Sequence, residues 1–288
     1  MEQRHLELPP EWGGIIPTEV FLEEGKRLVA EADKRAIQLR LLGGVAIRIH
    51  CSEFQDVATK LMRLGEGQQE YTDLDFMSYA KFRKNMMKEF FEAMGYEKRP
   101  TTMSTAATQR QIYFHPKGWF YVDVFYDKLL AANHPLDFRE RLELDSPTLT
   151  PTDLLLEKLQ IVFPDAKDAK DMLLLLRAHD VSLQEEKNKI NGGFIASLLA
   201  SDWGFWYTVT TNFDRLKQYL ADTKLLEGED LQDVTTKLDA LRQAVDNQPK
   251  TAGWKMRSTI GAKKRWYNPV ETRQTVGDFG IWKLRETK

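Results

Sequence analysis

The chain changes character once, near residue 145, and this change limits its fold more than any other feature. Before it, short segments with apolar residues at every second position alternate with segments of helical spacing. After Pro151 the spacing is helical almost throughout. Turn residues cluster at the change itself, in Asp145-Ser146-Pro147. We therefore predict an α+β protein with two domains, residues 1–145 and residues 146–288.

Local patterns predict the elements of both domains. In the first domain we expect a helix before Gln38, a strand, tight turn and helix start within residues 39–50, a strand at residues 71–77, a helix at residues 79–94 and strands at residues 110–115 and 119–126. Pro116-Lys117-Gly118 should join the last two strands as a hairpin. In the second domain we expect helices at residues 152–163, 168–178, 194–220 and 231–245, with a break at Trp203-Gly204.

Composition excludes several classes of protein. With 42% hydrophobic and 29% charged residues, the 288-residue chain has the balance of a globular protein. Its formal charge of -2 gives no overall attraction to nucleic acid or membranes. The single cysteine, Cys51, excludes an internal disulfide and fits a reducing compartment. Residues 1–12 lack an apolar signal core, so we expect a cytoplasmic protein with no membrane association.

Three carboxylates form the candidate metal site. Asp73 and Asp75 are separated by one residue, so in a strand both side chains emerge on one face while Leu74 and Phe76 enter the core. Two adjacent anions repel each other unless a hard cation lies between them. Asp123, in a later apolar strand, would complete a two-metal site. We expect Mg²⁺ there, with Mn²⁺ as the alternative.

A glycine pair supplies the complementary phosphate site. Gly43 and Gly44 follow a strand and precede a helix, where backbone N–H groups can approach phosphate oxygens closely. Each feature alone has an ordinary explanation: Asp-x-Asp as solvated carboxylates, the glycine pair as a simple turn, and Asp123 as an exposed strand residue. Their joint occurrence favours a site for a metal-bound nucleotide.

These motifs resemble those of the nucleotidyltransferase superfamily, with its polymerase beta-like fold. The resemblance rests on Leu-Leu-Gly-Gly-Val-Ala (41–46), Thr-Asp-Leu-Asp-Phe (72–76) and Val-Asp-Val-Phe (122–125). Thr-Asp-Leu-Leu-Leu-Glu-Lys-Leu-Gln (152–160), followed by Lys167-Asp168 and Asp171, resembles the AbiEii-type toxin nucleotidyltransferases; aminoglycoside nucleotidyltransferases belong to the same superfamily. One departure is Val45, since members often carry serine after the first glycine.

The resemblance implies a mixed β-sheet flanked by helices in the first domain, followed by a mainly helical domain. It implies transfer of a nucleoside monophosphate from an NTP to an acceptor hydroxyl, with release of pyrophosphate. Asp73 and Asp75 would bind metal, Asp123 would be the third carboxylate, and the glycine pair would contact the triphosphate. The acceptor would be tRNA, a protein or a small hydroxylated molecule such as an aminoglycoside, and an antitoxin would be a possible partner. The alternative is a binding or regulatory protein that retains this fold without turnover.

Three further residues are candidates for nucleotide binding. Lys158 would reach the phosphates from a helix, or it is a surface lysine paired with Glu157 or Asp153. Asp171 is a second candidate from the toxin-like motif, although it could simply favour a helix dipole. Arg110 would contact phosphate or base, or it forms a structural ion pair.

The C-terminal tail is basic and aromatic. Between Trp254 and Tyr267, five cations alternate with three aromatic residues. Such a segment could stack on the bases and neutralise the phosphates of RNA. The favoured alternative is that its tryptophans dock on the helical domain while its lysines stay solvated.

Overall fold

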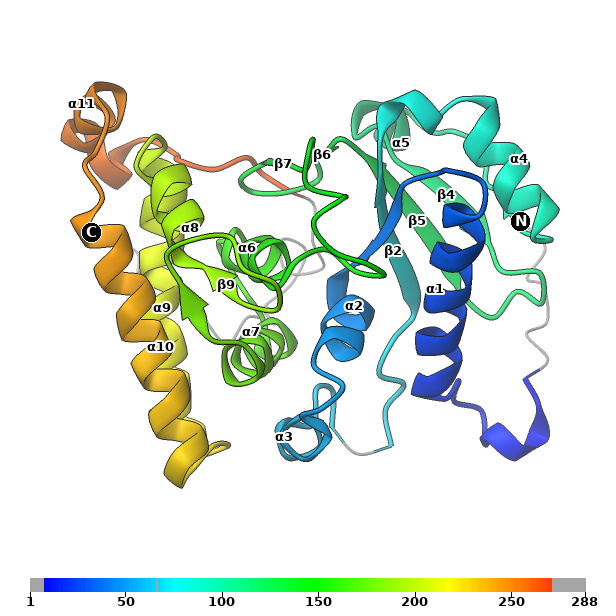
Figure 1. Ribbon diagram of the computed structural model, residues 1–288, viewed down its shortest axis with the longest axis horizontal. Coiled ribbons are helices and arrows are strands. Elements are labelled where there is room, and N and C mark those ends of the chain that lie inside the picture. The colour runs from blue at the N-terminus through cyan, green and yellow to red at the C-terminus, as the bar shows by residue number, and fades with distance from the viewer. Residues whose placement is uncertain (1–7, 66, 271–288) are drawn as a thin grey trace. The chain divides into compact units, whose positions relative to one another are not determined.

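The computed structural model describes residues 8–65 and 67–270, which form two compact units (Figure 1). Within the described residues, the first unit takes in the chain up to His50 together with residues 64–130 and 135–149. The second unit contains residues 51–63 and 131–134 and the described chain from Thr150 onward. Two short segments from the first half of the sequence therefore pack with the later helices.

A mixed sheet organises the first unit. Its elements are η1 (Pro10–Trp12), α1 (Thr18–Asp33), β1 (Leu39–Leu42), α2 (Gly43–His50), β2 (Asp73–Ser78), η2 (Ala80–Phe82), α4 (Asn85–Ala93), β3 (Glu97–Lys98), α5 (Met103–Ala107), β4 (Gln111–Phe114), β5 (Tyr121–Tyr126), β6 (Lys128–Leu129) and β7 (Leu136–Asp137). The strand order is β1-β2-β5-β4-β3. In addition, β6 pairs with the last residue of β5, and β7 pairs with β6. Only the central β2–β5 pair along this order is parallel.

One face of this sheet is apolar and covered by helices. Leu74 and Phe76 of β2 are fully buried, as the alternating pattern predicts. Leu41 on this face contacts α1, where a Cβ at Gly25 would lie 3.0 Å from the leucine side chain. Phe91 of α4 stacks on Tyr113 of β4 with ring centroids 4.2 Å apart. The opposite face is therefore the one that carries the aspartates.

Helices dominate the second unit. Its elements are α3 (Gln55–Leu61), α6 (Pro151–Leu159), α7 (Ala166–Ala178), β8 (Val181–Ser182), β9 (Ile190–Asn191), α8 (Gly192–Leu199), α9 (Trp203–Thr223), α10 (Gly228–Asn247), α11 (Ala252–Ile260) and η3 (Gly261–Lys263). β8 and β9 form a small parallel pair. The helix predicted at residues 194–220 is interrupted, but at residues 200–202 and not at Trp203-Gly204, which begin α9. Asp202 caps this new helix by accepting a hydrogen bond from Phe205 N at 3.0 Å.

The predicted fold class is confirmed: the protein is α+β, with a mixed sheet flanked by helices and a helical C-terminal part. The helix predicted at residues 79–94 begins only at Asn85. Asp127 accepts a hydrogen bond from Ala80 N at 2.9 Å, and the chain forms the 3-10 turn η2 there instead. Among the residues that the structure describes, no helix combines the length and apolarity needed to cross a membrane.

Candidate active site

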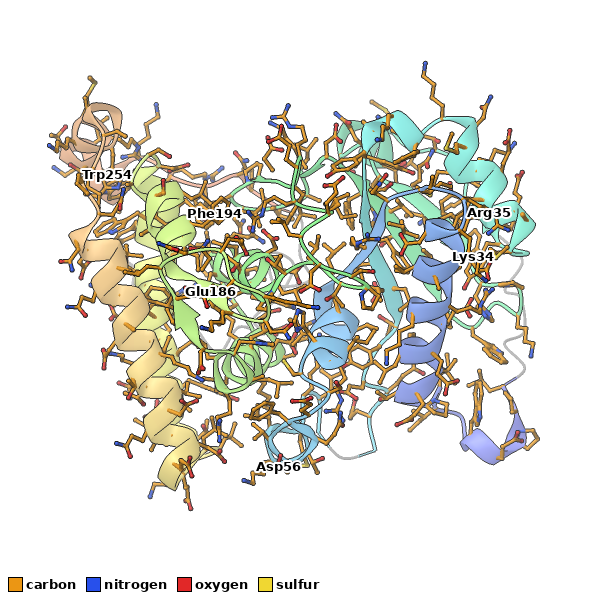
Figure 2. The ribbon with its side chains drawn as sticks, in the orientation of Figure 1. Lys34, Arg35, Asp56, Glu186, Phe194 and Trp254 are labelled. Carbon is orange, nitrogen blue, oxygen red and sulfur yellow. The ribbon has the colours of Figure 1, made fainter. Side chains whose placement is uncertain are left out.

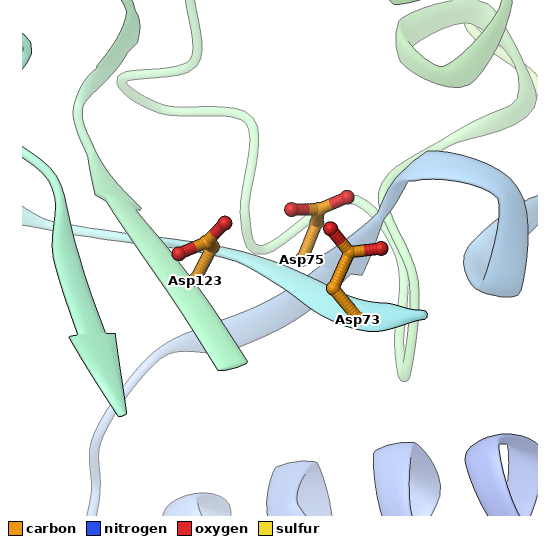
Figure 3. A group of neighbouring side chains, drawn as sticks. All are labelled: Asp73, Asp75 and Asp123. Atoms are coloured by element: carbon orange, nitrogen blue, oxygen red, sulfur yellow. The ribbon is translucent and has the colours of Figure 1, made fainter. Parts of the chain in front are cut away.

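Asp73, Asp75 and Asp123 come together on the sheet face opposite Leu74 and Phe76 (Figure 3). The parallel register pairs Asp75 with Asp123 across β2 and β5, and Asp73 lies two residues before Asp75 on the same face. One carboxylate oxygen from each residue lies within 4.8 Å of the other two. We call this group the carboxylate cluster. Its oxygens could hold a divalent cation.

Asp123 is the buried member of the cluster, with 3% of its surface exposed. Burial raises its pKa, Arg110 opposes this rise, and the negative charge of Asp73 adds to it. Arg110 Nη2 donates a hydrogen bond to Asp123 Oδ2. The other oxygen, Oδ1, is buried without a hydrogen-bond partner among the described residues. An unpaired buried carboxylate oxygen beside two further carboxylates suits a hard cation.

The turn between β1 and α2 is built around Gly43. Its φ of +76° lies in the left-handed region, and a Cβ there would stand 2.8 Å from Asp75 Oδ2. Glycine is therefore required both by the backbone and by the close approach of the carboxylate. Gly44 is the second residue of α2. The strand, turn and helix start predicted around the glycine pair are confirmed.

Arg110 stands just before β4 and not within a strand as predicted, since β4 begins at Gln111. Besides its bond to Asp123, its guanidinium lies 5.6 Å from the ring centroid of Phe125. The structural ion pair considered for this arginine is therefore present. Arg99, which the sequence patterns did not single out, is a second cation whose charge acts on Asp123. No spacing signal in the sequence links Arg99 to the aspartates.

Lys158 and Asp171 lie in the second unit, where they pair with each other at 3.0 Å. Lys158 also contacts Asp168 at 3.0 Å, and Asp171 accepts a hydrogen bond from Arg63 Nε at 2.8 Å. The alternative of a surface lysine is wrong: Lys158 is only 8% exposed. Every residue of α6 is buried, so this helix has no solvent face on which a lysine could lie. Nucleotide binding by Lys158 and Asp171 stays a prediction.

The described part of the C-terminal tail docks through its aromatic residues. The ring of Trp254, which is labelled in Figure 2, lies edge to face with the ring of Trp206, with centroids 5.1 Å apart. Trp266 Nε1 donates to Thr208 Oγ1 at 3.0 Å. Lys263 and its basic neighbours are exposed. The described part of the tail therefore has the favoured arrangement, with docked tryptophans and solvated lysines. Residues 271–288 of the predicted tail lie outside the described residues.

Comparisons with known proteins give little further information. No model of a protein family matches the chain, and no curated protein matches it. Among solved structures, the chain is similar to the solution structure of the antibiotic-resistance factor ANT(2'')-Ia, with 14% sequence identity and a TM-score of 0.29. The match covers 85% of this chain and 95% of that one. The functional conclusion therefore rests on the geometry of the carboxylate cluster.

Proposed function

We propose that the protein is a metal-dependent nucleotidyltransferase that moves a nucleoside monophosphate from an NTP to an acceptor hydroxyl. One observation carries this proposal: three carboxylates from two parallel strands converge within 4.8 Å on a sheet face next to the Gly43 turn. The unpaired Oδ1 of Asp123 supports it, because such an atom is costly unless it is paired or coordinated.

The residues of the site would have different roles in the reaction. Asp73, Asp75 and Asp123 would hold Mg²⁺ or Mn²⁺, which when bound neutralises phosphate charge and lowers the pKa of the attacking hydroxyl. Backbone N–H groups of Gly43 and Gly44 would hold the triphosphate. The acceptor oxygen forms a bond to the α-phosphorus, the bond from that phosphorus to the pyrophosphate oxygen breaks, and the hydroxyl proton passes to Asp123.

Arg110 would act between the acceptor and Asp123. Its guanidinium already neutralises part of the carboxylate cluster, and a guanidinium has further N–H donors that suit phosphate oxygens. We infer that it exchanges part of its contact with Asp123 for the bound nucleotide. Lys158 and Asp171 are retained as candidates for nucleotide binding, and the acceptor as tRNA, a protein or a small hydroxylated molecule.

The test combines transfer with metal binding. Wild type and the double variant Asp73→Asn/Asp75→Asn are incubated with each radiolabelled NTP, Mg²⁺ and an acceptor panel of tRNA, protein and kanamycin. We expect label transfer by wild type and a decrease in its rate of at least about a hundredfold in the variant. Replacing even a residue that only orients a metal ligand lowers metal affinity or activity by about 10–100-fold. Mn²⁺ affinity, measured by electron paramagnetic resonance, should fall in parallel.

Asp56→Asn is the matched control, because this carboxylate is 71% exposed and pairs only weakly with Lys60, at 3.8 Å. It should leave transfer and Mn²⁺ binding unchanged. The Arg110–Asp123 pair is the observation that favours the second candidate, a binding protein without turnover, since it compensates one carboxylate without a metal. A wild type that neither transfers label nor binds Mn²⁺, yet still binds a partner, would favour that alternative.

A further inference from the structure

The sheet face of the carboxylate cluster also carries an exposed tyrosine. Tyr121 opens β5 two residues before Asp123, and the parallel register pairs it with Asp73. Side chains two residues apart on a strand share a face, as do those at paired positions of neighbouring strands. Tyr121 therefore stands on the same face as the aspartates, directly beside them. It is 50% exposed, the largest exposure of any residue in β5.

A second aromatic ring supports Tyr121. Phe114 of β4 is its partner in the antiparallel register, and the two ring centroids are 5.3 Å apart at an angle of 58°. A contact of this kind is a favourable arrangement of two aromatic rings. It also leaves the ring partly accessible, as the exposed half of its surface requires. The pair thus presents an apolar surface beside the carboxylate cluster.

The strand order determines which substrate this surface would meet. In the order β1-β2-β5-β4, the Gly43 turn follows β1 on one side of the aspartates, and the Tyr121–Phe114 pair lies on β5 and β4 on the other side. In phosphoryl transfer the attacking and leaving oxygens are roughly in line through phosphorus. If the Gly43 turn holds the departing pyrophosphate, the acceptor hydroxyl must approach from the side of Tyr121.

We propose that Tyr121, held by Phe114, positions the acceptor by packing against the ring that carries or adjoins its hydroxyl. This rests on the proposed function and extends it to the acceptor. The surface suits a sugar ring or a base, which offer a flat or apolar face to an aromatic ring. The hydroxyl of a serine or threonine side chain adjoins no such face. Tyr121 is a positioning residue, and the chemistry stays with the aspartates.

Two probes distinguish the sources of such a ring: total tRNA for a nucleic acid and kanamycin for a free aminosugar. Tyr121→Ala should raise the acceptor KM about tenfold, since stacking on an aromatic side chain is worth about 1–3 kcal/mol, while the NTP KM stays unchanged. Tyr121→Phe keeps the ring and should behave as wild type. Met103→Ala, at a residue of the same unit that is 92% exposed, should change neither KM.

Direct binding makes the test independent of turnover. Saturation-transfer NMR measures contact of kanamycin, or of a CCA trinucleotide in place of tRNA, with each variant, and thermal melting confirms folding. Ring contact that is lost in Tyr121→Ala and kept in Tyr121→Phe supports the proposal, even if transfer is absent and the proposed function fails. An acceptor KM or a probe contact that is equal in wild type and Tyr121→Ala overturns it, as does a rise confined to the NTP KM.

Discussion

Burial and the positive charge of Arg110 shift the pKa of Asp123 in opposite directions. The low-dielectric surroundings favour its neutral form and raise its pKa, whereas the adjacent Arg110 favours the carboxylate. Such a group can accept a proton more readily than an exposed aspartate. The same balance explains why the residue is tolerated in a sheet at all, because an unpaired buried carboxylate would be far more costly.

Gly43 should not tolerate a side chain. We expect Gly43→Ala to lower the free energy of unfolding by about 1–3 kcal/mol, the cost of a non-glycine residue in the left-handed region. We also expect weaker Mn²⁺ binding, because the new Cβ would displace Asp75 Oδ2 from its position 2.8 Å away. Urea denaturation and Mn²⁺ titration measure the two effects.

Gly118→Ala separates these two causes. Gly118 has a φ of +71°, close to that of Gly43, but a Cβ there would meet nothing within 4 Å. Gly118→Ala should therefore lower the free energy of unfolding by a similar amount, through backbone strain, and keep the Mn²⁺ affinity of wild type. Equal Mn²⁺ affinities in the two variants would contradict the steric role assigned to Gly43.

At the scale of elements, α6 differs most from its sequence pattern. Its apolar residues predict one buried stripe, yet the whole helix is buried, including Asp153, Glu157 and Lys158. Burial alone would lower the pKa of Lys158, but the charges of Asp171 and Asp168 raise it above its usual value. The lysine is therefore held charged between two helices, α6 and α7, by its ion pairs.

Lys158→Met should lower the free energy of unfolding by about 3–5 kcal/mol, because it leaves Asp168 and Asp171 buried without their shared cation. Lys60→Met is the control: this lysine is 54% exposed and pairs with Asp230 at 3.1 Å, so its loss should cost less than about 1 kcal/mol. Chemical denaturation measures both values. A large rise in the NTP KM with unchanged stability would instead support phosphate binding by Lys158.

At the scale of the whole molecule, each unit contains a buried histidine that stacks on an aromatic ring. His115 in the first unit stacks on Trp119 with centroids 4.9 Å apart, and His134 in the second stacks on Phe205 at the same distance. Burial lowers the pKa of each to about 4. In the folded protein both imidazoles therefore stay neutral at pH values at which they are protonated in the unfolded chain, where histidine titrates near pH 6.5.

The protein should lose stability as the pH falls from 6.5 towards 4. In this range the two histidines bind protons in the unfolded chain but not in the folded protein. The free energy of unfolding is therefore highest above pH 6.5 and falls on acidification. We expect a decrease of roughly 1–2 kcal/mol per histidine between pH 7 and pH 5. Urea denaturation at both pH values, on wild type and on His115→Gln/His134→Gln, measures it. Equal pH dependence in both proteins would refute this origin.

The sequence alone determined the α+β class, the strand and turn around the glycine pair, and the shared face of Asp73 and Asp75. These follow from local periodicity, because side chains alternate along a strand and glycine alone adopts the turn without strain. Only the tertiary structure decided that β2 and β5 pair in parallel and bring Asp123 beside Asp75. It also decided the burial of Lys158 and the neighbours of Tyr121. Strand register and helix burial depend on contacts between residues far apart in sequence, which no local pattern encodes.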